Sequence, residues 1–192
     1  MTTLILAFAL AAPPAPPAPV PLDDATRAKL KEVAFQAARA GDATTLKEYF
    51  AAGFPADGTN AREDTLLILA VYHGHADAVE VILKQPKPAL KHRNKMAFTA
   101  LDGAAFKGSV PLAKQLVKAG ADVNGANDAG KTPLMLAALT GRTEMVKYLL
   151  EAGAKPDAAD KDGNTALRLA RTQGAKEVVA LLEASLEPKP KK

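Results

Sequence analysis

The chain has 192 residues, of which 48% are hydrophobic and 24% charged, while aromatic residues make up only 5% and tryptophan is absent. This length suffices for one hydrophobic core, which must be built mainly from Ala, Leu and Val. Three of the 25 basic residues, Lys189, Lys191 and Lys192, lie at the C-terminus, and the remaining 22 nearly balance the 21 acidic residues, which argues against a nucleic-acid-binding surface. The chain has no cysteine, so disulfides, a thiol nucleophile and a Cys-based zinc site are excluded.

The N-terminal residues 1–11 are predicted to be a secretory signal peptide. Leu4 to Ala12 form an apolar run that is too short for the roughly 20 residues of a membrane span. Ala9-Leu10-Ala11 supplies an Ala-x-Ala pattern, so we expect cleavage after Ala11 and a periplasmic or secreted protein. No Lys or Arg precedes the run, which leaves a disordered apolar N-terminus or a misassigned start codon as alternatives.

Residues 12–22 are predicted to be a proline-rich linker, because six prolines fall between residues 13 and 21. The folded domain is predicted to span residues 23–186. Its first unit, residues 23–59, begins with Asp23-Asp24, an acidic pair suited to a helix N-terminus. Charged side chains at Arg27, Lys29 and Lys31 suggest a terminal unit that faces water on one side.

A repeat governs the rest of the domain. Glycines that would separate two short helices recur with spacings of 33, 34, 33 and 33 residues, at Gly41, Gly74, Gly108, Gly141 and Gly174. A threonine that would open the first helix of a unit recurs in step, at Thr65, Thr99, Thr132 and Thr165. The predicted units are 23–59, 60–93, 94–126, 127–159 and 160–186, each a helix, a tight turn and a second helix. Such pairs need neighbours to bury their apolar faces.

This pattern resembles the ankyrin repeat. The resemblance rests on Gly130-Lys-Thr-Pro-Leu with Ala137-Ala138, on Gly163-Asn-Thr-Ala-Leu, and on the ending Ala119-Gly-Ala-Asp-Val-Asn124. It implies an all-α fold, an ankyrin-repeat solenoid of about five helix-turn-helix units joined by short hairpin-like turns.

Two units depart from the pattern. In the second, Glu63 stands where the hairpin glycine would be, and Gln85-Pro-Lys-Pro88 replaces the Gly-Ala ending, with one extra residue before Asn94. The segment 85–93 is either a tolerated surface insertion or a specialised contact loop. In the fifth unit, charged Arg171 and Glu183 replace apolar residues, as expected of an exposed end. Residues 187–192 are predicted to be a basic tail.

No motif in the sequence supports catalysis. In His73-Gly74-His75 the glycine would break the helix between the two histidines, so we expect no metal site. Gly103 to Ser109 has two glycines at phosphate-loop spacing but lacks the lysine after the second. We therefore expect no enzyme activity and no cofactor.

The resemblance implies binding through the turn tips and the exposed face of the first helices, which together form a concave surface. Large apolar groups with a charged rim are typical of interface hot spots. Phe98 and Phe106 have an alternative role as core residues between units. The predicted partner-binding residues are Arg62, Asp64, Tyr72, His73, Lys95, Met96, Phe98, Phe106, Lys107, Asp128, Lys131 and Leu139.

The sequence therefore predicts a protein–protein interaction scaffold of the small exported bacterial type, working in the cell envelope as a monomer that binds another protein. Two alternatives stay open. One is an inhibitor or immunity-type protein that occludes a periplasmic enzyme, and the other is a cytosolic adaptor. We expect no nucleic-acid partner and no membrane-spanning segment.

Overall fold

The computed structural model describes residues 22–187. The predicted signal peptide, the linker up to residue 21 and the tail from residue 188 lie outside these residues. Within residues 22–187 the chain forms ten helices and no regular strand. The helices are α1 (Asp24–Ala40), α2 (Ala43–Ala51), α3 (Leu66–Tyr72), α4 (Ala76–Leu83), α5 (Ala100–Lys107), α6 (Val110–Lys118), α7 (Pro133–Leu139), α8 (Thr143–Glu151), α9 (Ala166–Thr172) and α10 (Lys176–Leu186).

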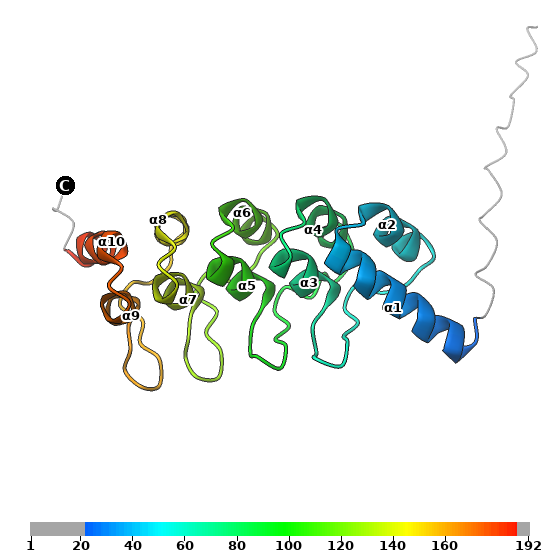
Figure 1. The fold of residues 1–192 in the computed structure, drawn as a ribbon, viewed down its shortest axis with the longest axis horizontal. Coiled ribbons are helices and arrows are strands. Elements are labelled where there is room, and N and C mark those ends of the chain that lie inside the picture. The colour runs from blue at the N-terminus through cyan, green and yellow to red at the C-terminus, as the bar shows by residue number, and fades with distance from the viewer. Residues whose placement is uncertain (1–21, 188–192) are drawn as a thin grey trace, which may run out of the picture.

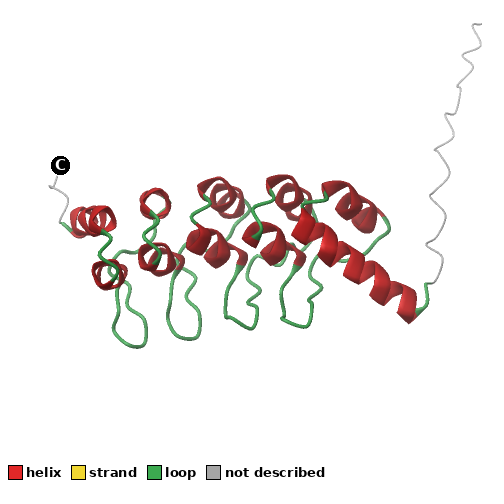
Figure 2. Ribbon diagram, viewed as in Figure 1, coloured by secondary structure: helices red, strands yellow, loops and turns green. Residues whose placement is uncertain are grey.

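The helices lie in two stacked rows (Figure 1). The odd-numbered helices α1 to α9 pack side by side in the first row, and the even-numbered helices α2 to α10 form the second. Each helix of one row also packs against its partner in the other. The predicted all-α solenoid of five helix pairs is confirmed, and its long loops project from one edge of the stack (Figure 2).

The recurring threonines and glycines set the helix boundaries. The side chain of each recurring threonine accepts a hydrogen bond from a backbone N–H three residues on, as in Thr65 with Ile68 (3.2 Å), which satisfies an N–H that the helix leaves without a partner. The glycine after each first-row helix takes a left-handed conformation, with φ between 64° at Gly141 and 84° at Gly74. Both predicted roles are confirmed.

The core lies between the rows and between neighbouring units. Small side chains in the first row let adjacent helices approach, and Ala38, Ala70, Ala105, Ala138 and Ala170 are completely buried. The second row contributes one fully buried leucine or isoleucine per unit, namely Leu46, Ile82, Leu116, Leu149 and Leu182. Because each unit buries its side chains against its neighbours, the stack is held by contacts between adjacent repeats.

The two ends of the stack face water, as predicted. At the N-terminal end, α1 extends well beyond the first-row helices that follow it (Figure 1), and Val33 on it is 50% exposed. At the other end, Arg171 of α9 and Glu183 of α10 form an exposed ion pair with an N–O distance of 2.6 Å. No helix within residues 22–187 is both long enough and apolar enough to cross a bilayer.

Candidate protein-binding surface

Four loops, here called fingers 1 to 4, comprise residues 60–64, 94–98, 127–131 and 160–164. Each opens on an Asn or Asp whose Oδ1 accepts hydrogen bonds from the backbone N–H groups two and four residues on. In finger 2, for example, Asn94 Oδ1 accepts from Met96 N at 3.0 Å and from Phe98 N at 3.1 Å. The same bonds recur at Asn60, Asn127 and Asp160. The first residue of each finger therefore holds the backbone of the turn from inside.

The fourth residue of each finger has a positive φ. It is a glycine in fingers 3 and 4, with φ of 81° at Gly130 and 73° at Gly163, but Glu63 and Ala97 in fingers 1 and 2, each with φ of 60°. Side chains with a Cβ resist this left-handed region, so the Asn bonds and the neighbouring fingers must keep Glu63 and Ala97 there.

Fingers 1 and 2 are joined to each other. Lys95 N donates to the carbonyl oxygen of Arg62 at 3.1 Å, and Lys95 Nζ donates to that of Ala61 at 2.8 Å. Asn94 Nδ2 donates to Asp64 Oδ1 at 2.7 Å, which crosses from one unit to the next. Asp64, which the sequence placed at an exposed tip, is only 7% exposed. Its carboxylate fastens the two fingers, so the structure assigns it an internal role.

A groove of about 350 Å³ lies where α1 and α3 meet these two fingers. Six of the twelve residues predicted to bind a partner line it, and Arg39 of α1, Ile68 and Leu69 of α3 and Asn94 of finger 2 complete it. The six are Arg62, Asp64, Tyr72, His73, Lys95 and Met96. Tyr72 is 43% exposed and Met96 69% exposed, so both present apolar surface to solvent.

The other six predicted residues lie outside this groove. Lys107 is exposed, and its Nζ lies 4.2 Å from the centroid of the Tyr72 ring, a cation–π contact that links α5 to α3. Asp128 is exposed on finger 3, where Lys131 is half-buried, and Leu139 is half-buried at the end of α7. Lys107 therefore adjoins the groove through Tyr72, whereas Asp128, Lys131 and Leu139 are not part of the groove lining.

Phe98 and Phe106 lie between the two predicted alternatives, which were contact with a partner and packing in the core. Both are half-buried, and their ring centroids lie 6.0 Å apart, so each ring covers part of the other. Neither belongs to the main core cluster or to the partly buried side chains packed against it. The pair is thus a small satellite cluster next to the groove, in which each ring keeps some exposed surface.

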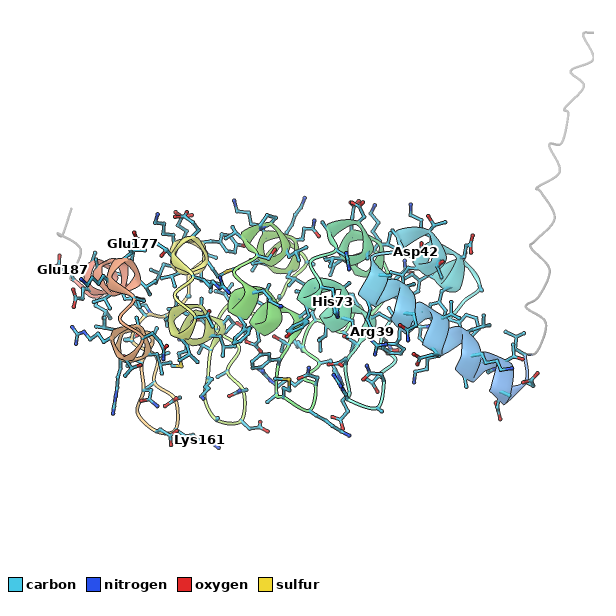
Figure 3. The ribbon with its side chains drawn as sticks, viewed as in Figure 1. Arg39, Asp42, His73, Lys161, Glu177 and Glu187 are labelled. Atoms are coloured by element: carbon cyan, nitrogen blue, oxygen red, sulfur yellow. The ribbon has the colours of Figure 1, made fainter. Side chains whose placement is uncertain are left out.

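Basic groups surround His73 at the end of α3. Figure 3 shows Arg39 and His73 close together where α1 meets α3. Partial burial is the main cause that lowers the pKa of His73 below its usual value, and the charges of His75, Arg39 and Lys107 lower it further. His75 Nε2 donates to the carbonyl oxygen of Arg39 at 2.8 Å, so this second histidine holds α1 to the stack. Several groups that carry or can gain a positive charge therefore lie near His73.

The insertion at residues 85–93 is fastened to the stack. His92 Nε2 donates to the carbonyl oxygen of Glu63 at 2.7 Å. Arg93 Nη1 donates to Asp102 Oδ2 and to the carbonyl oxygen of Ala97, both at 2.9 Å. Through these bonds to Glu63 and Ala97, the insertion helps to hold fingers 1 and 2 in place.

Comparisons with known proteins agree with the repeat. The sequence profile of the family described as "Ankyrin repeats (3 copies)" matches residues 34–127 and again residues 103–191. The chain is 30% identical over 96 residues, half of its length, to alpha-latrocrustotoxin-Lt1a of Latrodectus tredecimguttatus. It is also 30% identical over 111 residues, 58% of its length, to the inactive serine/threonine-protein kinase TEX14 of Mus musculus. The chain spans only 7% of the length of each of these relatives.

Proposed function

Because the chain belongs to the ankyrin-repeat family, whose repeats generally mediate protein–protein interaction and are typically non-enzymatic, we propose that it binds another protein through its finger surface. The finger surface is defined as fingers 1 to 4 together with the first-row residues that line the groove. It consists of loop tips and first-row residues, the parts of the stack through which the resemblance to ankyrin repeats implied binding.

One observation carries this proposal. Among residues 22–187, four large hydrophobic side chains are exposed, namely Val33, Tyr72, Met96 and Leu186. Val33 and Leu186 lie on the two terminal helices, whereas Tyr72 and Met96 line the same groove. Exposed apolar side chains that gather in a hollow with a charged rim are typical of a protein contact site.

The structure supports the same surface in a second way. Both fingers that form the groove are held internally, by their Asn side chains and by the bonds between Lys95 and finger 1. A contact surface that is already ordered loses little conformational entropy when a partner binds. We infer that the groove is the central part of the site and that the exposed residues of fingers 3 and 4 form its rim.

A capture experiment tests this function. Immobilised mature protein should retain a specific partner from an extract of its own cell envelope, and the variant Tyr72→Ala/Met96→Ala should lose it. The matched control is Val33→Ala/Leu186→Ala, which removes the two exposed hydrophobic side chains outside the groove and should retain the partner. If both double variants capture the same proteins as the parent, the finger surface is not the binding site.

We further propose that the protein is exported and works in the periplasm or outside the cell as a monomer. The proposal rests on the apolar run from Leu4 to Ala12 and the Ala9-Leu10-Ala11 pattern. Cell fractionation with N-terminal sequencing tests it, and the expected mature terminus lies near Ala12. Full-length protein that starts at Met1 and stays in the cytosol would favour the adaptor alternative. An envelope hydrolase that loses activity when captured would favour the inhibitor alternative.

A further inference from the structure

The charged residues that line the groove are mostly basic. Arg39, Arg62 and Lys95 all contribute to its lining. Asp64 is the one acidic residue of the lining, and its carboxylate already accepts hydrogen bonds from Asn94 Nδ2 at 2.7 Å and from Asn60 Nδ2 at 3.2 Å. An anion that enters the groove would therefore meet cations without a competing exposed carboxylate.

Most of these cations are not engaged with acidic side chains. Five ion pairs occur within residues 22–187, and none of them includes Arg62, Lys95 or Lys107. Arg39 Nη1 lies 3.8 Å from Glu32 Oε1 on the same helix, and the Glu32 side chain is 62% exposed, so this ion pair is weak. The folded part of the chain has 22 basic against 21 acidic residues, so the groove lining, with three basic residues and one acidic residue, is more basic than the fold as a whole.

A second hollow shares two lining residues with the groove. This hollow has a volume of about 410 Å³ and is lined by Glu32, Arg39, Asn60, Ala61 and Arg62. Arg39 and Arg62 thus border both hollows. Tyr72 and Met96 line only the groove, and the exposed carboxylate of Glu32 lines only the second hollow, so the groove is the place where an acidic and an apolar group of one ligand fit together.

We propose that the finger surface recognises a short acidic segment of its partner protein, in which carboxylates bind beside Arg39, Arg62 and Lys95 and one apolar side chain lies between Tyr72 and Met96. This inference rests on the proposed function and names the chemistry of the partner. Lys107 Nζ lies 4.2 Å from the centroid of the Tyr72 ring, so it adds a further cation beside the apolar surface of Tyr72.

A protein segment fits this site better than a nucleic acid does. Nucleic-acid surfaces spread basic groups along a stripe that follows the phosphate backbone, with aromatic rings on which bases stack. Here the groove lining holds Arg39, Arg62 and Lys95 beside Ile68, Leu69 and Met96, which have no ring. Its one tyrosine, the exposed Tyr72, already has Lys107 Nζ over its ring at 4.2 Å, so no series of open rings is present for base stacking. Arginine also matches the planar geometry of a carboxylate.

The test is a titration of the full mature protein with a labelled peptide in which a single phenylalanine is flanked on both sides by glutamates. Replacing the glutamates with glutamines should weaken binding at least about tenfold, and replacing the phenylalanine with alanine should also weaken it. The variant Arg62→Gln/Lys95→Gln should bind the acidic peptide at least about tenfold more weakly than the parent does.

The matched control variant is Lys118→Gln/Lys176→Gln. It removes the same charge from exposed positions on α6 and α10 and should change the affinity by less than about twofold. Arg62 makes no side-chain hydrogen bond within residues 22–187, so Arg62→Gln alone is a second variant if loss of the Lys95 bond loosens the fingers.

Equal binding of the glutamate and glutamine peptides, no detectable binding of either, or equal affinity of the parent and Arg62→Gln would overturn the inference. Tighter binding of an oligothymidine of matched length would overturn it in favour of a nucleic acid. The proposed function fails separately, since it depends on whether Tyr72→Ala/Met96→Ala loses the partner captured from the envelope. A captured partner together with an unbound acidic peptide leaves the function intact and removes only the acidic specificity.

Discussion

Replacing Arg93 with alanine removes the cationic partner of a buried carboxylate. Asp102 is 1% exposed, and its Oδ2 accepts hydrogen bonds from Arg93 Nη1 at 2.9 Å, from Thr99 N at 2.9 Å and from Thr99 Oγ1 at 2.8 Å. Its Oδ1 is buried without a hydrogen-bond partner. In Arg93→Ala, the carboxylate would keep only the two neutral donors of Thr99. We expect the variant to fold with reduced stability.

The size of the loss follows from the burial of the two partners. A hydrogen bond to a charged group contributes about 1.5–3 kcal/mol, and breaking a fully buried ion pair costs about 3–5 kcal/mol. The Arg93 side chain is 25% exposed, so water screens the pair in part and the lower range applies. We expect a loss of about 2 kcal/mol near pH 7. For a domain of this size, that corresponds to a melting temperature lower by about 4–8 °C.

The loss should depend on pH. Burial raises the pKa of Asp102 above its usual value, while the bonds from Thr99 and the charge of Arg93 act in the opposite direction. Without Arg93 this pKa rises further. A carboxyl group whose pKa is raised in the folded state binds protons more tightly there, so folding stability increases as the pH falls through the folded pKa toward the unfolded value of about 3.9. The cost of Arg93→Ala should therefore be full near pH 7 and smaller near pH 5.

Urea unfolding of the parent and Arg93→Ala at these two pH values measures the effect. The control is Arg171→Ala, which breaks an ion pair whose side chains are 59% and 48% exposed and should cost less than about 1 kcal/mol at either pH. Equal unfolding midpoints for the parent and Arg93→Ala near pH 7 would refute the role of this ion pair. A cost that is the same at both pH values would show that Asp102 is not the group that titrates.

Three further predictions concern the fingers and the groove. Glu63→Gly and Ala97→Gly should together stabilise the fold by about 1 kcal/mol, because glycine relieves the left-handed strain at a smaller entropic cost; a lower melting temperature would contradict this. Gly130→Ala should lower the stability of the fold by about 2 kcal/mol, because the new Cβ would lie 2.9 Å from the backbone of finger 4. The control Gly163→Ala, whose Cβ meets no atom within 4 Å, should lower the stability by only about half as much in the same melting experiment. Because the pKa of His73 is lowered, its side chain becomes positively charged only at a pH below the usual range for histidine. The acidic peptide should therefore bind more tightly as the pH falls from about 7 to about 5.5. A titration series with His73→Asn should show little of this pH dependence.

The fold was predictable because its signals are local and repeat. A threonine side chain bonds to a backbone N–H only three residues away, and a left-handed glycine acts within its own turn, so each unit shows the same residues at the same places. The Asn or Asp that opens each finger is just as regular. Asn60, Asn94, Asn127 and Asp160 recur in step with the threonines, and this register could have revealed their role. These bonds within the loops were not predicted.

The internal role of Asp64 was not predictable in this way. Its partner Asn94 lies in the next unit, and the bond depends on how closely two fingers approach, which no pattern within one unit reports. The same holds for Arg93 and Asp102, whose pairing depends on the path of an insertion that has no counterpart in the other units. Six of the twelve predicted contact residues do converge on one groove, because the repeat register alone brings helix ends and fingertips together.

The internal bonds of the fingers divide the residues of each finger between two tasks. The first and fourth residues maintain the turn through hydrogen bonds and a left-handed backbone, whereas the second and third contribute mainly their side chains to the solvent-exposed tip, as with Lys161 at the tip of finger 4 (Figure 3). Those tip pairs are Ala61-Arg62, Lys95-Met96, Asp128-Ala129 and Lys161-Asp162. Apart from Lys95, whose Nζ donates to the carbonyl oxygen of Ala61, the tip side chains make none of the bonds that hold the fingers, so mutations there can accumulate without selection against misfolding. A lineage of such proteins could therefore exchange one binding partner for another while the scaffold stays unchanged, and the same tips are the sites at which a directed-evolution library should be randomised.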